Sequence, residues 1–438
     1  MIVSLQPSLI QGHILAPASK SSMQRAVAAA LLKKGRTELF NPGHSNDDLA
    51  ALGVIRALGA TITETSASTV LISSEGVQPI TDLVNCGESG LGIRMFAPII
   101  ALSEQMITIE GEGSLTSRPM DFFDEVLPKL GVEIHSNDGK LPLRIKGPLQ
   151  PRNIKIDGSL SSQFLTGLLM AYAASNASGV SIKVNNLKSR PYIDLTLQVM
   201  KEFGLNTPAN KNYEEFVFPS SITGIGGPVE IESPVTNYSV EGDWSGSAFL
   251  LVAGAIAGEV EVKGIHNIST QADKKIVDAI LDAGAEVRVQ DDSVSVKRKD
   301  LEAFEFNATD CPDLFPPLVA LAAHCRGISK IRGLRRLKHK ESDRGATLKE
   351  EFDKLSTQID LNDDEMLVHG NGGVFVKNQI LNSHHDHRIA MACAVACLRS
   401  DFEVQIRNAE AVDKSYPDFW QHIKQLGAKV SEMSNVKP

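Results

Sequence analysis

Cations and hydroxyls stand at the starts of apolar runs in this sequence. Two motifs, PASKSSMQR and DGSLSSQF, supply Lys20, Ser21, Arg25, Ser161, Ser162 and Gln163. The start of a helix offers free N–H groups and the positive end of the helix dipole, so such residues are suited to bind a phosphate or a carboxylate. Ordinary capping by serine explains any single one of these positions equally well.

A second group precedes prolines. Arg118 in TSRPMD and Ser189 in KSRPYID stand at equivalent places, and Tyr192 follows Ser189 closely. Proline in the first turn of a helix explains the proline but not the arginine before it. Lys414 in VDKSYPDFW takes the same place later in the chain, which indicates a repeated anion-binding position.

Two further motifs are densely charged. LKHKESDR and HHDHR hold Lys340, Glu341, Arg344, His387 and Arg388. Lys340 and Arg344 are one helical turn apart if their segment is helical, and a charged run of this kind is most often a solvated surface. The histidines could suggest a metal, but no Cys or carboxylate pattern accompanies them, so we expect no metal site.

Asp313 in TDCPDLFPP precedes a very apolar run. Helix capping is its simpler role, and a general base with a tuned pKa is the alternative. We expect Cys86 to be a packed small residue and not a nucleophile. Seven cations could converge on one cleft that binds two anionic substrates: Lys20, Arg25, Arg118, Lys340, Arg344, Arg388 and Lys414.

The elements that must position these residues repeat along the chain. Six apolar runs, 68 to 84 residues apart, begin near Ser21, Gly90, Ser161, Ser245, Asp313 and Asp386. Each run is apolar on nearly every side, which predicts a buried helix. A short strand, a second helix and alternating strands follow each run, so the repeating unit is βαβαββ.

Glycine follows five of the six second helices, as a left-handed cap requires. These glycines are Gly59, Gly131, Gly204, Gly284 and Gly427, and Leu355-Ser356 takes their place in the fifth copy. The longest interval, 84 residues, has its extra residues in 206–242, which predicts a domain break there.

We therefore predict an α/β fold of two similar domains, each built from three βαβαββ repeats. Residues 1–14 and 238–438 form one domain and residues 15–237 the other, with the active site in the cleft between them.

Composition excludes several classes of protein. The chain has 438 residues and a net charge of −9, which argues against a nucleic-acid binder. Its five cysteines include no CxxC pair, so neither a disulfide framework nor a zinc site is expected. We see no secretory signal, and the longest apolar stretch, 248–257, is too short to span a bilayer. We expect a cytoplasmic protein that does not bind membranes.

The motifs together resemble the 3-phosphoshikimate 1-carboxyvinyltransferase (5-enolpyruvylshikimate-3-phosphate synthase) family. The resemblance rests on PASKSSMQR, DGSLSSQFLTGLLM, SRPYIDLTL, PDLFPPLVALA, KESDR, DHRIAM and DKSYPDFW, and it runs nearly end to end. It implies two domains, each an inside-out α/β barrel of three βαβαββ units that close on the substrates. It also implies transfer of the enolpyruvyl group of phosphoenolpyruvate to the 5-hydroxyl of shikimate 3-phosphate, with release of phosphate, by a monomer that needs no metal or organic cofactor.

The resemblance also implies roles for residues at the motif positions. Shikimate 3-phosphate would contact Lys20, Ser21, Arg25, Ser161, Ser162, Gln163, Ser189, Tyr192, Asp313 and Lys340. Phosphoenolpyruvate would contact Lys20, Gly90, Arg118, Gln163, Arg344, Arg388 and Lys414. Asp313 would take the proton of the 5-hydroxyl, and Glu341 or Lys20 would handle the methyl proton.

Three positions depart from the family pattern. Ala18 replaces the glycine of PGSK, and Glu88 and Leu91 replace an asparagine and a threonine before the second apolar run. A carboxylate at position 88 is unfavourable near an anion site unless it pairs with Arg94 or points away.

Three rival interpretations were weighed. The related enolpyruvyl transferase that acts on UDP-N-acetylglucosamine typically has a reactive loop cysteine and lacks DGSxSSQ and KESDR. An RNA-terminal phosphate cyclase would need a nucleotide site and a catalytic histidine motif, neither of which is found. A non-catalytic binding protein descended from the enzyme is supported only by Glu88 and Leu91.

Overall fold

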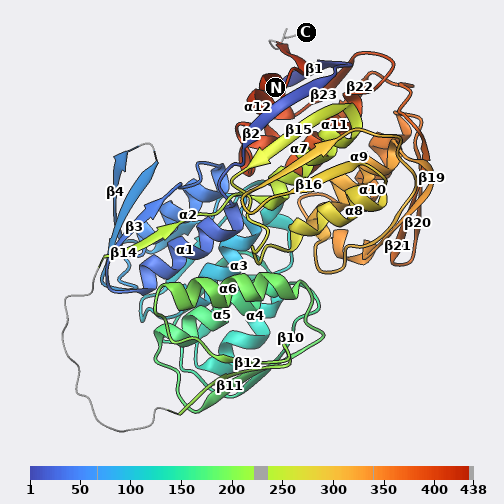
Figure 1. Cartoon of the computed structure of the whole chain (residues 1–438). Helices are drawn as coiled ribbons and strands as arrows, with labels where there is room; N and C mark the ends of the chain where they lie inside the picture. The colour runs from blue at the N-terminus through green and yellow to red at the C-terminus, as the bar shows by residue number, and fades with distance from the viewer. Residues whose placement is uncertain (67, 221–234, 339, 434–438) are drawn as a thin grey trace. The chain divides into compact units, whose positions relative to one another are not determined.

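The structure, a computed structural model, describes residues 1–66, 68–220, 235–338 and 340–433. The chain divides into two compact units (Figure 1). Unit 1 comprises Met1–Ser19 and Glu241–Pro438, and unit 2 comprises Lys20–Val240. Residues 221–234, which belong to the insertion expected between the third and fourth repeats, lie outside the described residues.

Unit 2 contains three repeats with the same order of elements. The first has β14 (Thr236–Ser239), α1 (Lys20–Leu32), β3 (Gly35–Phe40), α2 (Asn46–Ala57), β4 (Thr61–Ser66) and β5 (Thr69–Ser74). The second has β6 (Leu83–Asn85), α3 (Gly90–Ile100), β7 (Ile107–Glu110), α4 (Asp121–Val126), β8 (Glu133–Asn137) and β9 (Lys140–Lys146). The third has β10 (Ile154–Asp157), α5 (Ser162–Ala174), β11 (Val180–Asn185), α6 (Arg190–Glu202), β12 (Ala209–Lys211) and β13 (Glu215–Phe218).

Unit 1 repeats this order. Its first repeat has β2 (Ile10–Leu15), α7 (Trp244–Ala257), β15 (Gly258–Lys263), α8 (Ile276–Asp282), β16 (Glu286–Val289) and β17 (Ser293–Lys297). Its second has β18 (Glu305–Asn307), α9 (Phe315–Ala323), β19 (Arg326–Arg332), α10 (Arg344–Asp353), β20 (Gln358–Asn362) and β21 (Glu365–Asn371). Its third has β22 (Ile380–Asn382), α11 (His387–Cys397), β23 (Val404–Arg407), α12 (Phe419–Gln425), β24 (Lys429–Met433) and β1 (Ile2–Gln6).

Short 3-10 helices extend several of the connections. They are η1 (Gly113–Ser117), η2 (Leu127–Leu130), η3 (Ala272–Lys275), η4 (Pro312–Leu314), η5 (Leu334–Leu337) and η6 (Ala409–Lys414).

The described residues form six four-stranded sheets of one topology. In each sheet the two strands that flank the buried helix in the repeat pair in parallel, and the last two strands of the repeat add antiparallel. For example, β6 pairs with β7 in parallel, and β9 joins β7 and β8 antiparallel. The βαβαββ repeat predicted from the sequence is therefore confirmed.

Two strands join sheets far from their sequence neighbours. Strand β2, which directly precedes α1 in the chain, pairs with β15 in unit 1. Strand β14, which precedes α7, pairs with β3 in unit 2. Strand β1 lies between β23 and β24, so both ends of the chain meet in one sheet of unit 1.

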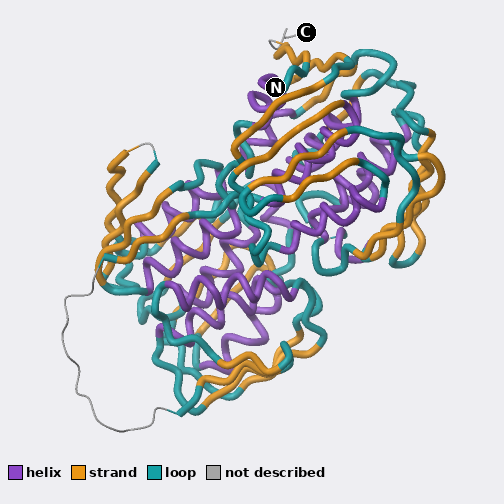
Figure 2. Tube along the Cα trace, viewed as in Figure 1, coloured by secondary structure: helices purple, strands orange, loops and turns teal. Residues whose placement is uncertain are grey.

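The buried helices form the core of each unit. Helices α1, α3 and α5 pack together in unit 2, and α7, α9 and α11 pack together in unit 1. In each unit the helices lie inside and the sheets outside (Figure 2). Every residue of α7 is buried, as its uniformly apolar sequence predicts, so truncation of a core residue such as Leu250 to Ala would cost about 2–5 kcal/mol of stability.

The predicted helix ends are also confirmed. All five predicted cap glycines have positive φ, and Ser356 (φ 57°) takes the left-handed position in the fifth copy. No helix in the described residues combines the length and apolar character that a membrane span requires.

Candidate active site

Lys20 opens the first buried helix of unit 2 and is bound to a buried acid. Helix α1 begins at Lys20, as predicted, and its Nζ donates to Asp47 Oδ2 at 2.9 Å. Asp47 stands in the first turn of α2 and is almost fully buried, and its Oδ1 has no hydrogen-bond partner among the described residues. Burial raises the pKa of the adjacent Asp48 to about 6, despite hydrogen bonds from Ser45. Asp47 is therefore the carboxylate that fixes the Lys20 ammonium.

Arg25 is a buried cation that binds only neutral groups. Its guanidinium donates to Thr196 Oγ1 at 2.9 Å, to the Ser21 carbonyl at 2.8 Å and to the Tyr192 carbonyl at 3.4 Å. Burial lowers the pKa of Arg25 to about 10, and no carboxylate among the described residues offsets this effect. A buried guanidinium without a counter-ion favours an anion at this place.

Two arginines lie at the start of α3. A Cβ atom added at Gly90 would lie 2.4 Å from Arg118 Nη1, so the guanidinium packs directly on this glycine. Arg94 Nη1 donates to Gln163 Oε1 at 3.1 Å, and its guanidinium lies 5.1 Å from the centre of the Phe164 ring. Gly90, Arg118 and Gln163, predicted separately, are thus brought together.

Glu88 lies against the segment that carries Arg118. A Cβ atom added at Gly113 would be 2.3 Å from Glu88 Oε1, so the carboxylate packs on the first residue of η1. Arg118 directly follows η1. The printed partner of Arg94 is Gln163 and not Glu88.

The serines at α5 and α6 differ in what they do. Ser161 caps α5, because its Oγ accepts the Gln163 N–H at 3.2 Å, and Ser162 is buried in the first turn. Ser189 precedes α6 with φ 55°, and its hydroxyl makes no capping hydrogen bond. The capping explanation therefore holds for Ser161 and not for Ser189.

In unit 1, Asp313 is bound by three cations. Its Oδ1 accepts from Arg344 Nη1 at 2.8 Å and from Lys340 Nζ at 3.0 Å, and its Oδ2 accepts from Arg388 Nη2 at 3.3 Å. Burial alone would raise the pKa of Asp313, but the charges of Arg388, Lys340 and Arg344 outweigh it and hold the pKa well below its usual range. Asp313 lies in η4 and does not cap α9, so the capping explanation is wrong.

Arg344 is the centre of this cluster and is 1% exposed. Its Nη2 donates to Glu341 Oε2 at 2.6 Å, and its Nε and Nη2 donate to Asp386 at 2.7 and 3.2 Å. Asp386 also caps α11 by accepting the Arg388 N–H at 3.0 Å. These carboxylates outweigh burial, which by itself lowers the pKa of Arg344, and raise it above its ordinary value.

Two expectations about the KESDR motif are wrong. Helix α10 begins at Arg344, so Lys340 and Glu341 precede it and are not one helical turn from Arg344 along the helix. The motif is also not a solvated surface, because Arg344 is buried and Glu341 nearly so. A buried charge is stable only when paired, and the paired carboxylates draw this segment inward.

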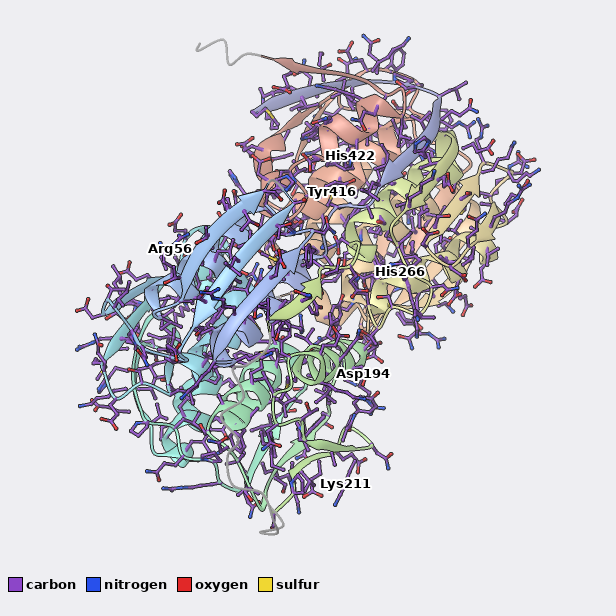
Figure 3. All side chains as sticks on the ribbon, turned by 60° about the vertical axis from the view of Figure 1, so that its left-hand side comes forward. Arg56, Asp194, Lys211, His266, Tyr416 and His422 are labelled. Carbon is purple, nitrogen blue, oxygen red and sulfur yellow. The ribbon has the colours of Figure 1, made fainter. Side chains whose placement is uncertain are left out.

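Lys414 ends η6 and is buried. The turn after it is anchored by Tyr416, whose buried hydroxyl hydrogen-bonds with His422 Nδ1 at 2.7 Å (Figure 3). The five cysteines are buried and unbridged, and burial raises the pKa of Cys86 to about 12. The expectation of a packed, unreactive Cys86 is confirmed.

Comparison with known proteins agrees with this arrangement. The family model for EPSP synthase (3-phosphoshikimate 1-carboxyvinyltransferase) matches residues 5–423. The chain belongs to the EPSP synthase family. Its relatives include the 3-phosphoshikimate 1-carboxyvinyltransferases of Clostridium novyi, 32% identical, and of Clostridium acetobutylicum, 34% identical, each aligned over 99% of both chains.

Solved structures of the EPSP synthase fold match as well. The EPSP synthase of Acinetobacter baumannii has a TM-score of 0.78 and 24% identity over 98% of this chain and 100% of that chain. The enolpyruvyl transferase NikO of Streptomyces tendae has a TM-score of 0.74 and 18% identity over 98% of each. The predicted family and the predicted fold class are confirmed.

Sequence reasoning missed several groups that the EPSP synthase fold places beside the predicted residues. Asp47 and Asp386 bind Lys20 and Arg344, and both stand in the first turn or at the cap of a helix. Asp273, fully buried, accepts a short hydrogen bond from Ser245, and burial and then the charge of Asp313 raise its pKa to about 6. The signal for the first two was present: acids at helix starts near lone cations.

Proposed function

We propose that this chain transfers the enolpyruvyl group of phosphoenolpyruvate to the 5-hydroxyl of shikimate 3-phosphate. The products are 5-enolpyruvylshikimate 3-phosphate and phosphate, in the biosynthesis of aromatic amino acids. Family membership supports the reaction. The observation that carries the mechanism is one ionised carboxylate, Asp313, in contact with three cations.

The residues of unit 2 are proposed to serve mainly shikimate 3-phosphate. The hydroxyls of Ser161, Ser162 and Ser189 would bind its phosphate, and Arg25 its carboxylate, with Ser21, Gln163 and Tyr192 completing the contacts. The uncompensated charge of Arg25 supports this assignment, because a ligand carboxylate would provide the counter-ion that the described residues lack.

Phosphoenolpyruvate is proposed to contact cations of each unit. In unit 2 these are Lys20 and Arg118, with Gly90 and Gln163 beside them, and in unit 1 they are Arg344, Arg388 and Lys414. The close packing of Arg118 on Gly90 supports the pairing of these two positions. We further propose that the units are the two domains of the family fold, with boundaries near residues 14 and 237.

Asp313 is proposed to accept the proton of the 5-hydroxyl. Its pKa is well below the usual range, so the carboxylate is ionised but weakly basic. A bound anion that takes up the charge of Arg344 and Arg388 would raise this pKa. The base would thus become stronger when phosphoenolpyruvate is bound, and Lys340 would remain to hold Asp313 in place.

The addition forms a bond between the 5-oxygen and C2 of phosphoenolpyruvate, and C3 gains a proton. We propose Lys20 or Glu341 as the group that donates it. In the elimination, the bond from C2 to the phosphate oxygen breaks and C3 loses a proton. Fixed cations stabilise the charge of the carboxylate and phosphate through both steps.

The enzyme is proposed to act in the cytoplasm as a monomer, without a metal or an organic cofactor.

The test is release of inorganic phosphate by the purified chain. We expect release only when both substrates are present, with each substrate alone as the control. Asp313→Ala should lower turnover far more than it weakens substrate binding. A folded protein that binds both substrates but releases no phosphate would favour the non-catalytic alternative and overturn the proposal.

A further inference from the structure

We propose that Glu351 and His384 are positioning residues: they hold the loop Ser383–Asp386 so that Asp386 and Arg388 are correctly placed around Arg344 and Asp313. This inference rests on the proposed function, since it concerns the same anion-binding cluster of unit 1. Neither residue belongs to that cluster, and no motif in the sequence pointed to them.

The loop has an unfavourable backbone. His384 and His385 are consecutive, and both have positive φ, 51° and 58°. Residues other than glycine, and least of all two in a row, rarely adopt this conformation unless their surroundings impose it. Asp386 follows at once, caps α11 and binds Arg344. An error in the loop would therefore pass directly to the cluster.

A single buried carboxylate imposes the conformation. Glu351 is fully buried, and its Oε1 accepts from His384 Nε2 at 2.7 Å and from Lys354 Nζ at 2.7 Å. Its Oε2 accepts from the Asn382 N–H at 2.9 Å. We call these contacts of Glu351 with His384 and Asn382 the Glu351 clamp. The Glu351 clamp binds both the backbone that enters the loop and a side chain within it.

The loop has further support on its other side. Ser383 Oγ donates to the Asn408 carbonyl at 2.8 Å and accepts the His385 N–H at 3.1 Å. Asn382 Oδ1 accepts the His384 N–H at 2.8 Å. These bonds fix the turn, but none of them connects the loop with α10.

Only the Glu351 clamp and Arg344 make printed side-chain contacts from α10 to this loop. Glu351 follows Arg344 by seven residues, so the two side chains lie on one face of α10, about 10 Å apart along its axis. Arg344 binds Asp386, and Glu351 binds His384, two residues earlier. The face of one helix thus holds the loop at two points, one inside the proposed site and one outside it.

The same residues do not favour a metal site. Ligand atoms of Glu350, Glu351 and His384 lie within 4.8 Å of one another. However, the Lys354 ammonium already contacts Glu351 Oε1 at 2.7 Å, in the place that a cation would take. The cluster is an ion-pair network that includes a lysine, and its geometry serves the loop.

The experiment compares His384→Asn with His369→Asn. Asparagine tolerates positive φ but does not reach Glu351, so the substitution at 384 removes the clamp without straining the backbone further. His369 is a matched control, because its Nε2 lies 2.8 Å from Asp360 Oδ2 and its side chain is 30% exposed, against 29% for His384. His384→Gln, which is longer and can donate to Glu351, is the rescue variant.

We expect His384→Asn to weaken binding of inorganic phosphate, measured by calorimetry, about tenfold, and to raise the KM for phosphoenolpyruvate similarly. Binding of shikimate 3-phosphate alone should stay within about twofold, His369→Asn should match the wild type, and His384→Gln should recover part of the loss. Equal phosphate affinity in His384→Asn and the wild type would overturn the inference. So would an equal loss of affinity for both substrates, which a merely structural role predicts. Phosphate binding tests the clamp even if the wild type proves inactive, so failure of the proposed function is recognised separately.

Discussion

Substitution of Asp313 by asparagine should change binding and turnover in opposite directions. The Asp313 carboxylate contacts Arg344, Lys340 and Arg388 at 2.8, 3.0 and 3.3 Å. An anionic substrate would compete with it for the same cations. Asparagine keeps the shape of the side chain but removes both this competition and the proposed base.

The magnitude follows from the geometry. Unit charges about 4 Å apart interact by about 4 kcal/mol at the effective dielectric near a protein surface. The Asp313 side chain is 25% exposed, and the freed cations can rearrange, so we expect a net gain of about 1–2 kcal/mol for a bound phosphate. This gain is an affinity about 5–30 times higher. Loss of a general base should lower turnover by about 10²–10⁴.

The assay combines calorimetry of phosphate binding with thermal denaturation. Asp313→Asn leaves Lys340 without its ion-pair partner and should lower the melting temperature, and phosphate should restore it by more than it stabilises the wild type. Asp360→Asn, on β20 of the same unit, is the control for loss of a carboxylate. Phosphate affinity in Asp313→Asn that is no higher than in the wild type would refute the argument that this carboxylate competes with the substrate.

Three further predictions concern unit 2. Gly90→Ala places a Cβ 2.4 Å from Arg118 Nη1, so the guanidinium must shift, and the KM for phosphoenolpyruvate should rise about tenfold in steady-state kinetics with little change in melting temperature. Burial raises the pKa of Asp48 to about 6, so the folded state binds its proton more tightly and stability falls as the pH rises from about 4 to 6; denaturant titrations of Asp48→Asn should lack a fall of about 3 kcal/mol over this window. Lys20→Met should abolish turnover and lower stability, because it leaves buried Asp47 unpaired, whereas adding Asp47→Asn should restore stability alone.

Each of these predictions has an outcome that contradicts it. Gly53→Ala is the control for Gly90, because nothing lies within 4 Å of a Cβ built there, and equal kinetics in the two variants would show that contact with Arg118 is unimportant. An unchanged pH profile in Asp48→Asn would place the titration elsewhere. If Asp47→Asn failed to restore the stability of Lys20→Met, the ion pair would not be the cause of the loss.

The parts of the fold that repeat locally could be predicted, and those that depend on pairing at long range could not. The run that became α7 is apolar all round, so its burial followed from composition alone. The exchange of β2 and β14 between sheets leaves no mark in either strand, because strand partners are selected by the whole sheet. The sequence could place both strands in a repeat but not in a unit.

The same distinction applies to the site. Arg388 at the start of an apolar run was readable, because a cation there has few structural roles. The place of Lys340 was not, because four-residue spacing suggests a helical pair and the helix begins only at Arg344. Asp386 was hidden by a second duty, since an acid before a helix is expected to cap it, and here it caps α11 and binds Arg344 at once.

The placement of β1 and β14 has a consequence for how the protein is made. Unit 2 is one uninterrupted stretch of chain, whereas unit 1 joins the first 19 residues to everything after Val240. During synthesis, all strands of unit 2 have left the ribosome soon after β14, and that unit can complete its sheets. Strand β1 is made first of all, yet both its neighbours, β23 and β24, are made last. The oldest strand of the nascent chain must therefore wait, with two unpaired edges, until almost the whole polypeptide has been translated.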